Sequence, residues 1–227
     1  MSATINLAAP ITRQLDGEWR WAIQDARWQD YVSLGGFLPS PFRLAFDGRT
    51  LEMMVTGALH DDYADALDTF FKAVAEALEI PFKPYRSTSW DRPEIERGIQ
   101  ADNCYYLDPV KIKAGYAGRA RKSNDVRDYP NPDLAIEVDL STPKADRESI
   151  YAALGIVELW VFNGKVLTIS RPGQDGRYRR VERSGFLPVR ADQVLRWLLE
   201  EESHDYTAWT RRIRAWAKRS LKKRGSK

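Results

Sequence analysis

The sequence predicts an α/β fold in which a mixed β-sheet is flanked by helices, with an N-terminal hairpin and a C-terminal helical extension. Short segments with the alternation or continuous apolar character of strands are interspersed with longer segments whose apolar residues recur every three or four positions. In addition, no internal repeat, low-complexity tract or Gly/Ser linker divides the 227 residues. We therefore expect a single domain over residues 1–227, with its core at about 42–182 and C-terminal helices and a basic tail over 191–227.

In the N-terminal half, the expected elements follow from local patterns, although the Trp-rich first segment is ambiguous. Residues 42–46 alternate between apolar and polar, and the following Asp47-Gly48 pair is a hairpin turn signal. From Tyr63 to Leu78 apolar residues recur at helical spacing, and Pro81 stops this helix. In chain order we expect a helix over 25–34, hairpin strands over 42–46 and 51–55, a helix over 60–78, and strands around 85–90 and 102–107.

In the C-terminal half, residues 108–131 are polar and contain glycine, with five cations between Lys111 and Lys122, so a long loop is expected there. Long loops are often functional. Gly155 is a helix stop signal, and Asn163-Gly164 is a second hairpin turn signal. The other expected elements are a strand over 133–140, a helix over 146–154, hairpin strands over 157–162 and 166–170, an edge strand over 177–182, and helices over 191–201 and 206–221.

Cysteine usage and hydropathy bear on the compartment. Cys104 is the only cysteine, so no intramolecular disulfide and no cysteine-based zinc site can form, which indicates a reducing environment. The first twenty residues lack a basic start followed by an apolar stretch, and no run of about 18 apolar residues occurs. We expect a cytoplasmic protein that is neither secreted nor membrane-spanning.

The charge is small overall but unevenly distributed. From Arg211 onward nine residues are basic and none is acidic, which leaves 26 basic against 32 acidic residues in the remainder of the chain. A basic tail on an acidic body can bind phosphate or an acidic partner, and it can equally be a solvated helix end.

The segment 132–140 is the densest chemical signal. Because side chains alternate across a strand, one face is apolar and the other carries carboxylates. The apolar face has Leu134, Ile136, Val138 and Leu140, and the other has Asp133, Ala135, Glu137 and Asp139. At roughly 3.3 Å per residue, Glu137 and Asp139 lie about 6.6 Å apart along the strand and Asp133 about 13 Å from Glu137. The inner pair could therefore share the surroundings of one ion.

A carboxylate face on a central strand is costly unless cations or hydrogen-bond donors meet it. A hard cation such as Mg²⁺, held by one or two carboxylates together with waters and a substrate phosphate, would offset this cost. The alternative is an edge strand whose acidic face is simply solvated. Spacing alone leaves both open.

Five blocks in order resemble the Uma2 family, which is common in cyanobacteria and other bacteria and is similar to the PD-(D/E)XK nuclease superfamily. The blocks are residues 46–54, His60, residues 101–106, residues 132–138, and Asp146 with residues 151–160. The resemblance covers about residues 47–181. It implies a restriction-endonuclease-like α/β core and a metal-dependent DNA endonuclease activity.

Carried over by position, the resemblance implies the site residues. Glu52 resembles the family's acidic residue after the hairpin, and His60 its helix-opening histidine. Asp102 resembles the first metal-binding aspartate, and Glu137 the acidic residue of the (D/E)XK element. The resemblance thus implies that Glu52, Asp102 and Glu137 hold Mg²⁺ or Mn²⁺.

The sequence departs from the pattern at the lysine. Asp139 stands where the superfamily has lysine, and the replacement lysine of Uma2-type sequences would fall on Ile150. Lys144 is the nearest cation, and we take it as the candidate catalytic lysine. Such a lysine orients or helps to deprotonate the attacking water and stabilises developing phosphate charge. Its absence puts turnover in question.

Other polar and aromatic residues have structural explanations that require no functional role. His60, beside Asp61 and Asp62, can be part of a helix cap. His204 is expected at the surface. Trp209 and Trp216, seven residues apart, fit a core-facing or dimer-facing helix stripe better than a base-stacking platform.

The leading function is therefore a metal-dependent DNA endonuclease that hydrolyses phosphodiester bonds. The alternative is a nucleic-acid-binding or interaction protein on the same fold with weakened or lost catalysis. A third reading, a structural or partner-binding domain without nucleic acid, would gain if the cations faced away from the carboxylates. DNA binding is expected to use residues Lys111 to Lys122 and the tail from Arg211. A two-fold homodimer would suit a duplex-cutting enzyme with one site per chain.

Overall fold

The computed structural model describes residues 18–39, 41–200 and 205–221. Its strands are β1 (Trp19–Ile23), β2 (Arg43–Phe46), β3 (Leu51–Val55), β4 (Lys83–Arg86), β5 (Gly98–Ile99), β6 (Asn103–Tyr106), β7 (Leu134–Val138), β8 (Glu158–Phe162), β9 (Leu167–Pro172) and β10 (Tyr178–Val181). Its α-helices are α1 (Trp28–Phe37), α2 (Ala58–Ala77), α3 (Pro109–Ala120), α4 (Arg147–Ala153), α5 (Ala191–Leu198) and α6 (Tyr206–Ser220), with 3₁₀ turns η1 (Pro93–Ile95) and η2 (Val126–Asp128).

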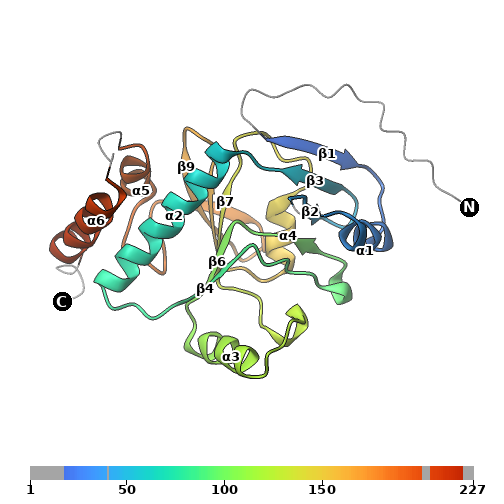
Figure 1. Cartoon of the computed structure of the whole chain (residues 1–227), viewed down its shortest axis with the longest axis horizontal. Coiled ribbons are helices and arrows are strands. Elements are labelled where there is room, and N and C mark those ends of the chain that lie inside the picture. Colours follow the sequence, from blue (N-terminus) through green and yellow to red (C-terminus); the bar gives the residue numbers. More distant parts are fainter. Residues whose placement is uncertain (1–17, 40, 201–204, 222–227) are drawn as a thin grey trace, which may run out of the picture.

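Ten strands form two sheets (Figure 1). The larger has the order β10-β9-β8-β7-β6-β4, and it is mixed because β7 and β8 are parallel while the other neighbours are antiparallel. The smaller has the order β1-β3-β2-β5 and contains the expected hairpin of β2 and β3. The predicted α/β class, with a mixed sheet, flanking helices, an N-terminal hairpin and C-terminal helices, is confirmed.

The two faces of the larger sheet have different partners, and β7 lies between them. Leu134, Ile136 and Val138 pack with the apolar side chains of α2, α5 and α6. Ala135, from the opposite face of β7, packs with Ile150 and other side chains of α4. All five residues of β7 are buried, so this strand is central and the solvated-edge alternative is wrong.

The smaller sheet lies on the α4 side of the molecule (Figure 1). Its outer face packs against α1 through Trp28 and Tyr31, which contact Phe46. Alternation along β1, β2 and β3 places Arg20, Arg43 and Glu52 on the inner face. Polar side chains of one sheet therefore point toward the end of β7.

The expected loop over 108–131 is wrong, because this segment contains α3 and η2. Two glycines lower its helical propensity, and the structure explains them by packing. A Cβ on Gly115 would come within 2.8 Å of the Tyr106 ring, and one on Gly118 within 2.4 Å of the Tyr129 ring. The glycines allow α3 to approach these rings.

Two further differences concern strand positions. β4 occupies Lys83–Arg86 rather than 85–90, and it contains Pro84. Proline is tolerated there because β4 is the edge of the larger sheet. β1 and β5 were not expected. Within the described residues, no helix has the length and apolar character needed to cross a membrane.

Candidate functional site

The register of β6 and β7 places Asp102 beside Glu137. Asn103 pairs with Ile136, so Asp102, one residue earlier in the antiparallel pair, lies level with Glu137. Oδ2 of Asp102 accepts a hydrogen bond from the backbone N–H of Val138 at 2.8 Å. Both carboxylates are buried, with 2% and 1% of their residue surfaces exposed. The sheet thus brings together the two acidic residues that the family pattern pairs.

Glu52 approaches the same region from β3. Its Oε1 accepts hydrogen bonds from Arg20 at 2.6 Å and from Arg147 at 3.1 Å. Its Oε2 accepts from the backbone N–H groups of Lys144 and Ala145. These four bonds use the four lone-pair positions of a carboxylate, so Glu52 joins the smaller sheet to the start of α4.

Arg147, the first residue of α4, is the centre of the cluster. Its guanidinium donates to Glu137 at 2.6 Å and to Glu52 at 3.1 Å, and it lies 3.2 Å from Asp139. Burial alone would lower the pKa of Arg147, but Asp139, Glu137 and Glu52 raise it further than burial lowers it. Three carboxylates therefore share one buried cation.

Arg20 makes a second bridge, from β1. It donates to Glu52, to Asp139 at 2.8 Å and to Glu18 at 3.1 Å. Glu18 in turn accepts from the backbone N–H groups of Leu140 and Ser141. Burial opposes ionisation of Glu18, but the hydrogen bond from the Ser141 hydroxyl and the charge of Arg20 bring its pKa below the usual value.

The environment of Asp102 is completed by Arg43 and His60. Arg43 donates to Oδ1 of Asp102. Nε2 of the fully buried His60 lies 3.3 Å from Oδ2 of Asp102 but has no hydrogen-bond partner among the described residues. Burial, together with the charge of Arg43, lowers the pKa of His60 and so favours its neutral form.

The cluster carries more carboxylates than guanidiniums. Five acidic side chains face three arginines, which leaves two negative charges in excess when every carboxylate is ionised. The five are Glu18, Glu52, Asp102, Glu137 and Asp139, and the three are Arg20, Arg43 and Arg147. Burial raises the pKa of Glu137 to about 7, although Arg147 acts in the opposite direction. Ionisation of Glu137 is therefore costly in this cluster.

Asp102 and Glu137 both keep oxygen lone pairs for a cation. Each oxygen of these two carboxylates accepts one hydrogen bond from the described residues: Asp102 from Arg43 and Val138, and Glu137 from Tyr151 and Arg147. Each therefore retains a lone pair, whereas Glu52 retains none. No group of three or more His, Cys, Asp or Glu side chains within the described part of the chain is arranged to hold a metal ion. The donor chemistry of the adjacent Asp102 and Glu137 fits an oxygen-seeking cation.

Lys144, the candidate catalytic lysine, does not pair with the carboxylates through its side chain. The backbone N–H of Lys144 binds Glu52, but the Lys144 side chain is exposed and forms no ion pair with a described residue. Ile150 is fully buried in the apolar contacts of α4. The cation that contacts Glu137 is Arg147, which the sequence reasoning did not consider.

A signal for Arg147 was present in the sequence. Positions 147, 150, 151 and 154 form a helical stripe, and all four are buried in α4 and its end. Since three of these residues are apolar or aromatic, the stripe places Arg147 on the inward face. Arg43 could be found from the alternation of β2, whereas Arg20 required recognition of β1.

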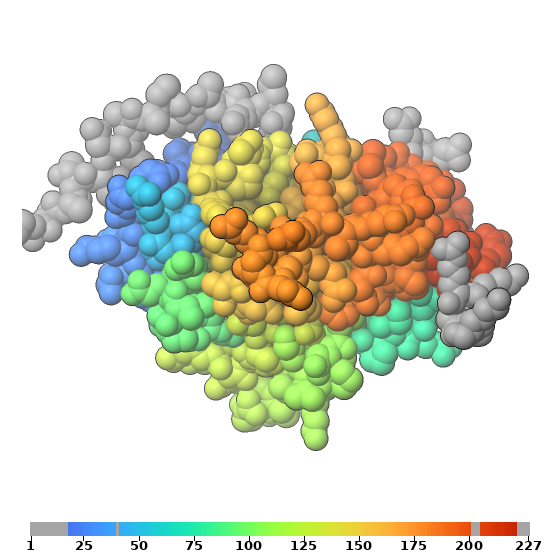
Figure 2. Space-filling view, turned by 180° about the vertical axis from the view of Figure 1, so that it is seen from behind, coloured from blue at the N-terminus to red at the C-terminus, as the bar shows by residue number. Residues whose placement is uncertain are grey.

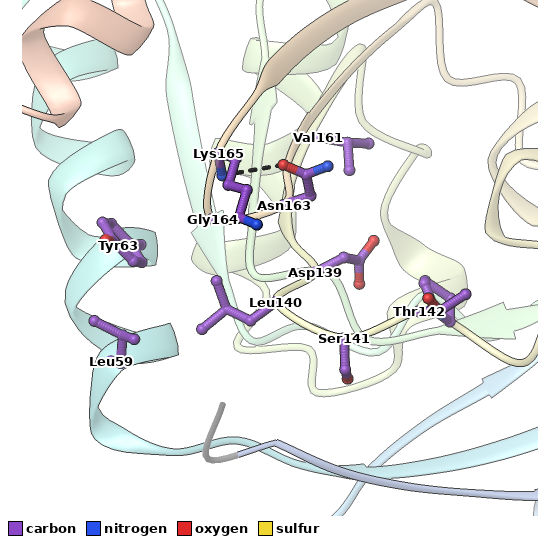
Figure 3. A pocket seen from close by; sticks show the side chains of 11 residues that line it. Leu59, Tyr63, Asp139, Leu140, Ser141, Thr142, Val161, Asn163, Gly164 and Lys165 are labelled. Carbon is purple, nitrogen blue, oxygen red and sulfur yellow. Dashed lines mark hydrogen bonds between the residues drawn. The ribbon is translucent and has the colours of Figure 1, made fainter. Parts of the chain in front are cut away.

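A cavity of about 650 Å³ adjoins the cluster (Figure 3). It lies between α2, the residues that follow β7, and the turn that joins β8 to β9. Asp139 lines it and also belongs to the cluster. Among the described residues that line it, Lys165 is the only cation.

The basic segments lie away from the cluster. β6 runs from Asn103, next to Asp102, to Tyr106, and α3 follows at its other end. In Figures 1 and 2, α3 lies at the bottom of the molecule, whereas the smaller sheet lies toward the top. The described part of the tail is α6, which packs on α2 at the far side from the smaller sheet (Figure 1). His204 and residues 222–227 lie outside the described residues.

The structure tests the predictions for the tryptophan stripe of α6 and for His60. Trp209 is buried in the core with Ile213, and Trp216 packs on Phe70 and Trp197, so the helix stripe faces the core. His60 is not a helix cap, because the cap residue of α2 is Gly57.

Comparison with known proteins adds the family. The model of the Uma2 family, described as "Putative restriction endonuclease", matches residues 28–200. No curated protein matches the chain. Among solved structures, a protein of Anabaena variabilis ATCC 29413, described as "a putative nuclease belonging to DUF820", aligns with 77% of this chain and 99% of its own, at a TM-score of 0.47 and 12% identity. Because the family model matches well over half of its residues, the chain belongs to the Uma2 family.

Proposed function

We propose that this protein is a nuclease that hydrolyses phosphodiester bonds of DNA with the help of Mg²⁺ or Mn²⁺. The observation that carries the proposal is the pair Asp102 and Glu137, side by side at the end of the central strand in a buried cluster with excess negative charge. Membership of a family described as restriction endonucleases supports the same chemistry. The single, buried Cys104 is in keeping with a reducing compartment such as the cytoplasm.

In this proposal the residues of the cluster have distinct roles. Asp102 and Glu137 would hold the ion, which polarises the phosphodiester and lowers the pKa of a bound water. Arg147 would take the role of the missing lysine, because its guanidinium contacts Glu137 directly and can stabilise charge on phosphate oxygens. Glu52 is a positioning residue that fixes Arg147 and the start of α4.

A second candidate, a nucleic-acid-binding or interaction protein without catalysis, is favoured by a specific observation. Every carboxylate of the cluster accepts a hydrogen bond from Arg20, Arg43 or Arg147, and Glu52 is saturated. Such a network can stabilise a core without any ion. The position of α3 and α6 away from the cluster favours the third reading, a structural or partner-binding domain without nucleic acid.

A cleavage assay separates the two candidates. Purified protein is incubated with supercoiled plasmid, linear duplex and single-stranded DNA, each with Mg²⁺, with Mn²⁺ or with EDTA. We expect cleavage of at least one substrate with either metal and none with EDTA. Asp102→Asn, prepared in parallel, controls for contaminating nucleases, because its amide oxygen can still accept from Val138.

DNA binding without metal-dependent cleavage of any substrate would reject the nuclease and leave the second candidate. Equal cleavage by Asp102→Asn would assign the activity to a contaminant or to another site. The homodimer remains a prediction.

A further inference from the structure

The wall of the cavity beside the carboxylate cluster combines apolar side chains with a cation. Leu59 and Tyr63 of α2 form an apolar side together with Leu140, and the turn that carries Lys165 lies across from α2, with Val161 beyond it (Figure 3). The Tyr63 ring is held in place by edge-on packing against Phe162, with ring centroids 4.9 Å apart. The cavity therefore offers a fixed aromatic and aliphatic surface facing a cation.

Lys165 is held over the cavity by its turn. Oδ1 of Asn163 accepts the backbone N–H groups of Lys165 at 3.1 Å and Val166 at 2.8 Å, and Gly164 has a φ of +84°. These features fix the turn between β8 and β9. The Lys165 side chain is exposed and makes no ion pair within the described residues, so its charge is available to a ligand.

Lys165 is the group of the cavity wall that attracts an anion, whereas Asp139 opposes one. The charge of Asp139 is offset in part by Arg20 at 2.8 Å and Arg147 at 3.2 Å, which it shares with other carboxylates. The same Arg147 contacts Glu137 at 2.6 Å. A ligand in the cavity would consequently lie next to the proposed cleavage site.

We propose that this cavity binds one unpaired nucleotide of the DNA substrate, with Lys165 at its phosphate and Leu59 and Tyr63 against its base. This inference rests on the proposed nuclease function and specifies its substrate. A duplex backbone would need cations only, whereas the apolar wall suits a base, and every base has an apolar face that can stack. A base within a duplex cannot enter a cavity unless it is unpaired. The volume of about 650 Å³ lies within the range of roughly 300–1,000 Å³ typical of small-ligand pockets.

The proposal predicts a preference for single-stranded DNA that depends on Lys165. Anisotropy of a fluorescein-labelled thymidine oligonucleotide is measured in EDTA, so that no cleavage occurs, with the duplex of the same length as comparison. We expect the single strand to bind more tightly, Lys165→Ala to weaken its binding about tenfold, and Lys165→Arg to restore it, as for one charge-assisted contact. Thymidine 5′-monophosphate should compete better than thymidine or inorganic phosphate.

A matched pair of variants tests the place of binding. Leu59→Asp adds a negative charge at the second residue of α2, and Val32→Asp adds the same charge on α1, which packs on the outer face of the smaller sheet and does not line the cavity. The two positions are matched in exposure, at 51% and 52%. We expect Leu59→Asp to weaken binding several-fold more than Val32→Asp, because only the former faces the ligand.

Equal effects of the two aspartate variants, or unchanged binding by Lys165→Ala, would overturn the cavity proposal. If the protein nevertheless cleaves DNA with metal, the nuclease function stands and only this inference fails. If binding depends on Lys165 as expected but no substrate is cleaved, the inference about the ligand stands and the nuclease function fails.

Discussion

Replacing Arg147 with alanine is expected to lower the free energy of unfolding by about 3–5 kcal/mol, the usual cost of removing one partner from a buried ion pair. The physical reason is that Arg147 is the shared cation of Glu52, Glu137 and Asp139, all of which are buried. Without it these carboxylates face one another with less compensation. Urea denaturation followed by circular dichroism measures the change.

Two controls give this expectation its specificity. Arg147→Lys keeps the charge, so we expect a smaller loss of stability than for alanine. Some loss should remain, because lysine cannot donate in two directions with the same geometry. Arg127→Ala removes an exposed guanidinium that pairs with Asp125, and exposed pairs contribute little. A loss for Arg147→Ala no larger than that for Arg127→Ala would show that the cluster does not hold α4 in place.

Glu137→Gln is expected to reduce metal-dependent cleavage by about two orders of magnitude or more, because the amide keeps the shape but removes the charge proposed to hold the ion. Single-turnover cleavage rates at saturating Mg²⁺ measure this effect. Asp133→Asn is the matched control, since Asp133 is a buried carboxylate at the opposite end of β7 that binds Leu107 and Asp108. We expect it to leave the rate unchanged.

The same variant has a readout that does not depend on activity. Burial raises the pKa of Glu137 to about 7, above the unfolded value of about 4.5, so the folded state binds more protons between these values. This carboxyl therefore lowers stability as the pH rises from about 4.5 to 7. Glu137→Gln lacks this contribution, and its stability relative to the native protein should rise with pH across that interval. A constant difference would show that Glu137 is ionised throughout.

Much of the fold could be predicted because the responsible patterns are local. The alternation of segment 132–140 identified β7 and its two faces, and the Asp47-Gly48 pair identified the hairpin. The failure at α3 has a tertiary cause. Gly115 and Gly118 resemble loop residues until the rings of Tyr106 and Tyr129, which they accommodate, are known.

The carboxylates of the candidate site were predicted from the sequence, whereas their arginine partners were missed. Asp102 and Glu137 come from two strands whose pairing the family pattern implies. Arg20 and Arg43 reach them from a second sheet, which no local pattern placed against β7. The superfamily pattern requires a lysine and therefore points to Lys144, whereas the cation that contacts Glu137 is Arg147, which belongs to the buried stripe of α4.

The central claim is that Asp102 and Glu137 together hold a divalent cation. Anomalous scattering from crystals soaked with Mn²⁺ tests it most directly, at a concentration that supports DNA cleavage in solution. The account predicts one strong peak that contacts oxygens of both Asp102 and Glu137, with Glu52 still bound to Arg147. A peak elsewhere, or ion pairs of Asp102 with Arg43 and of Glu137 with Arg147 that persist without a peak between the two carboxylates, would contradict it.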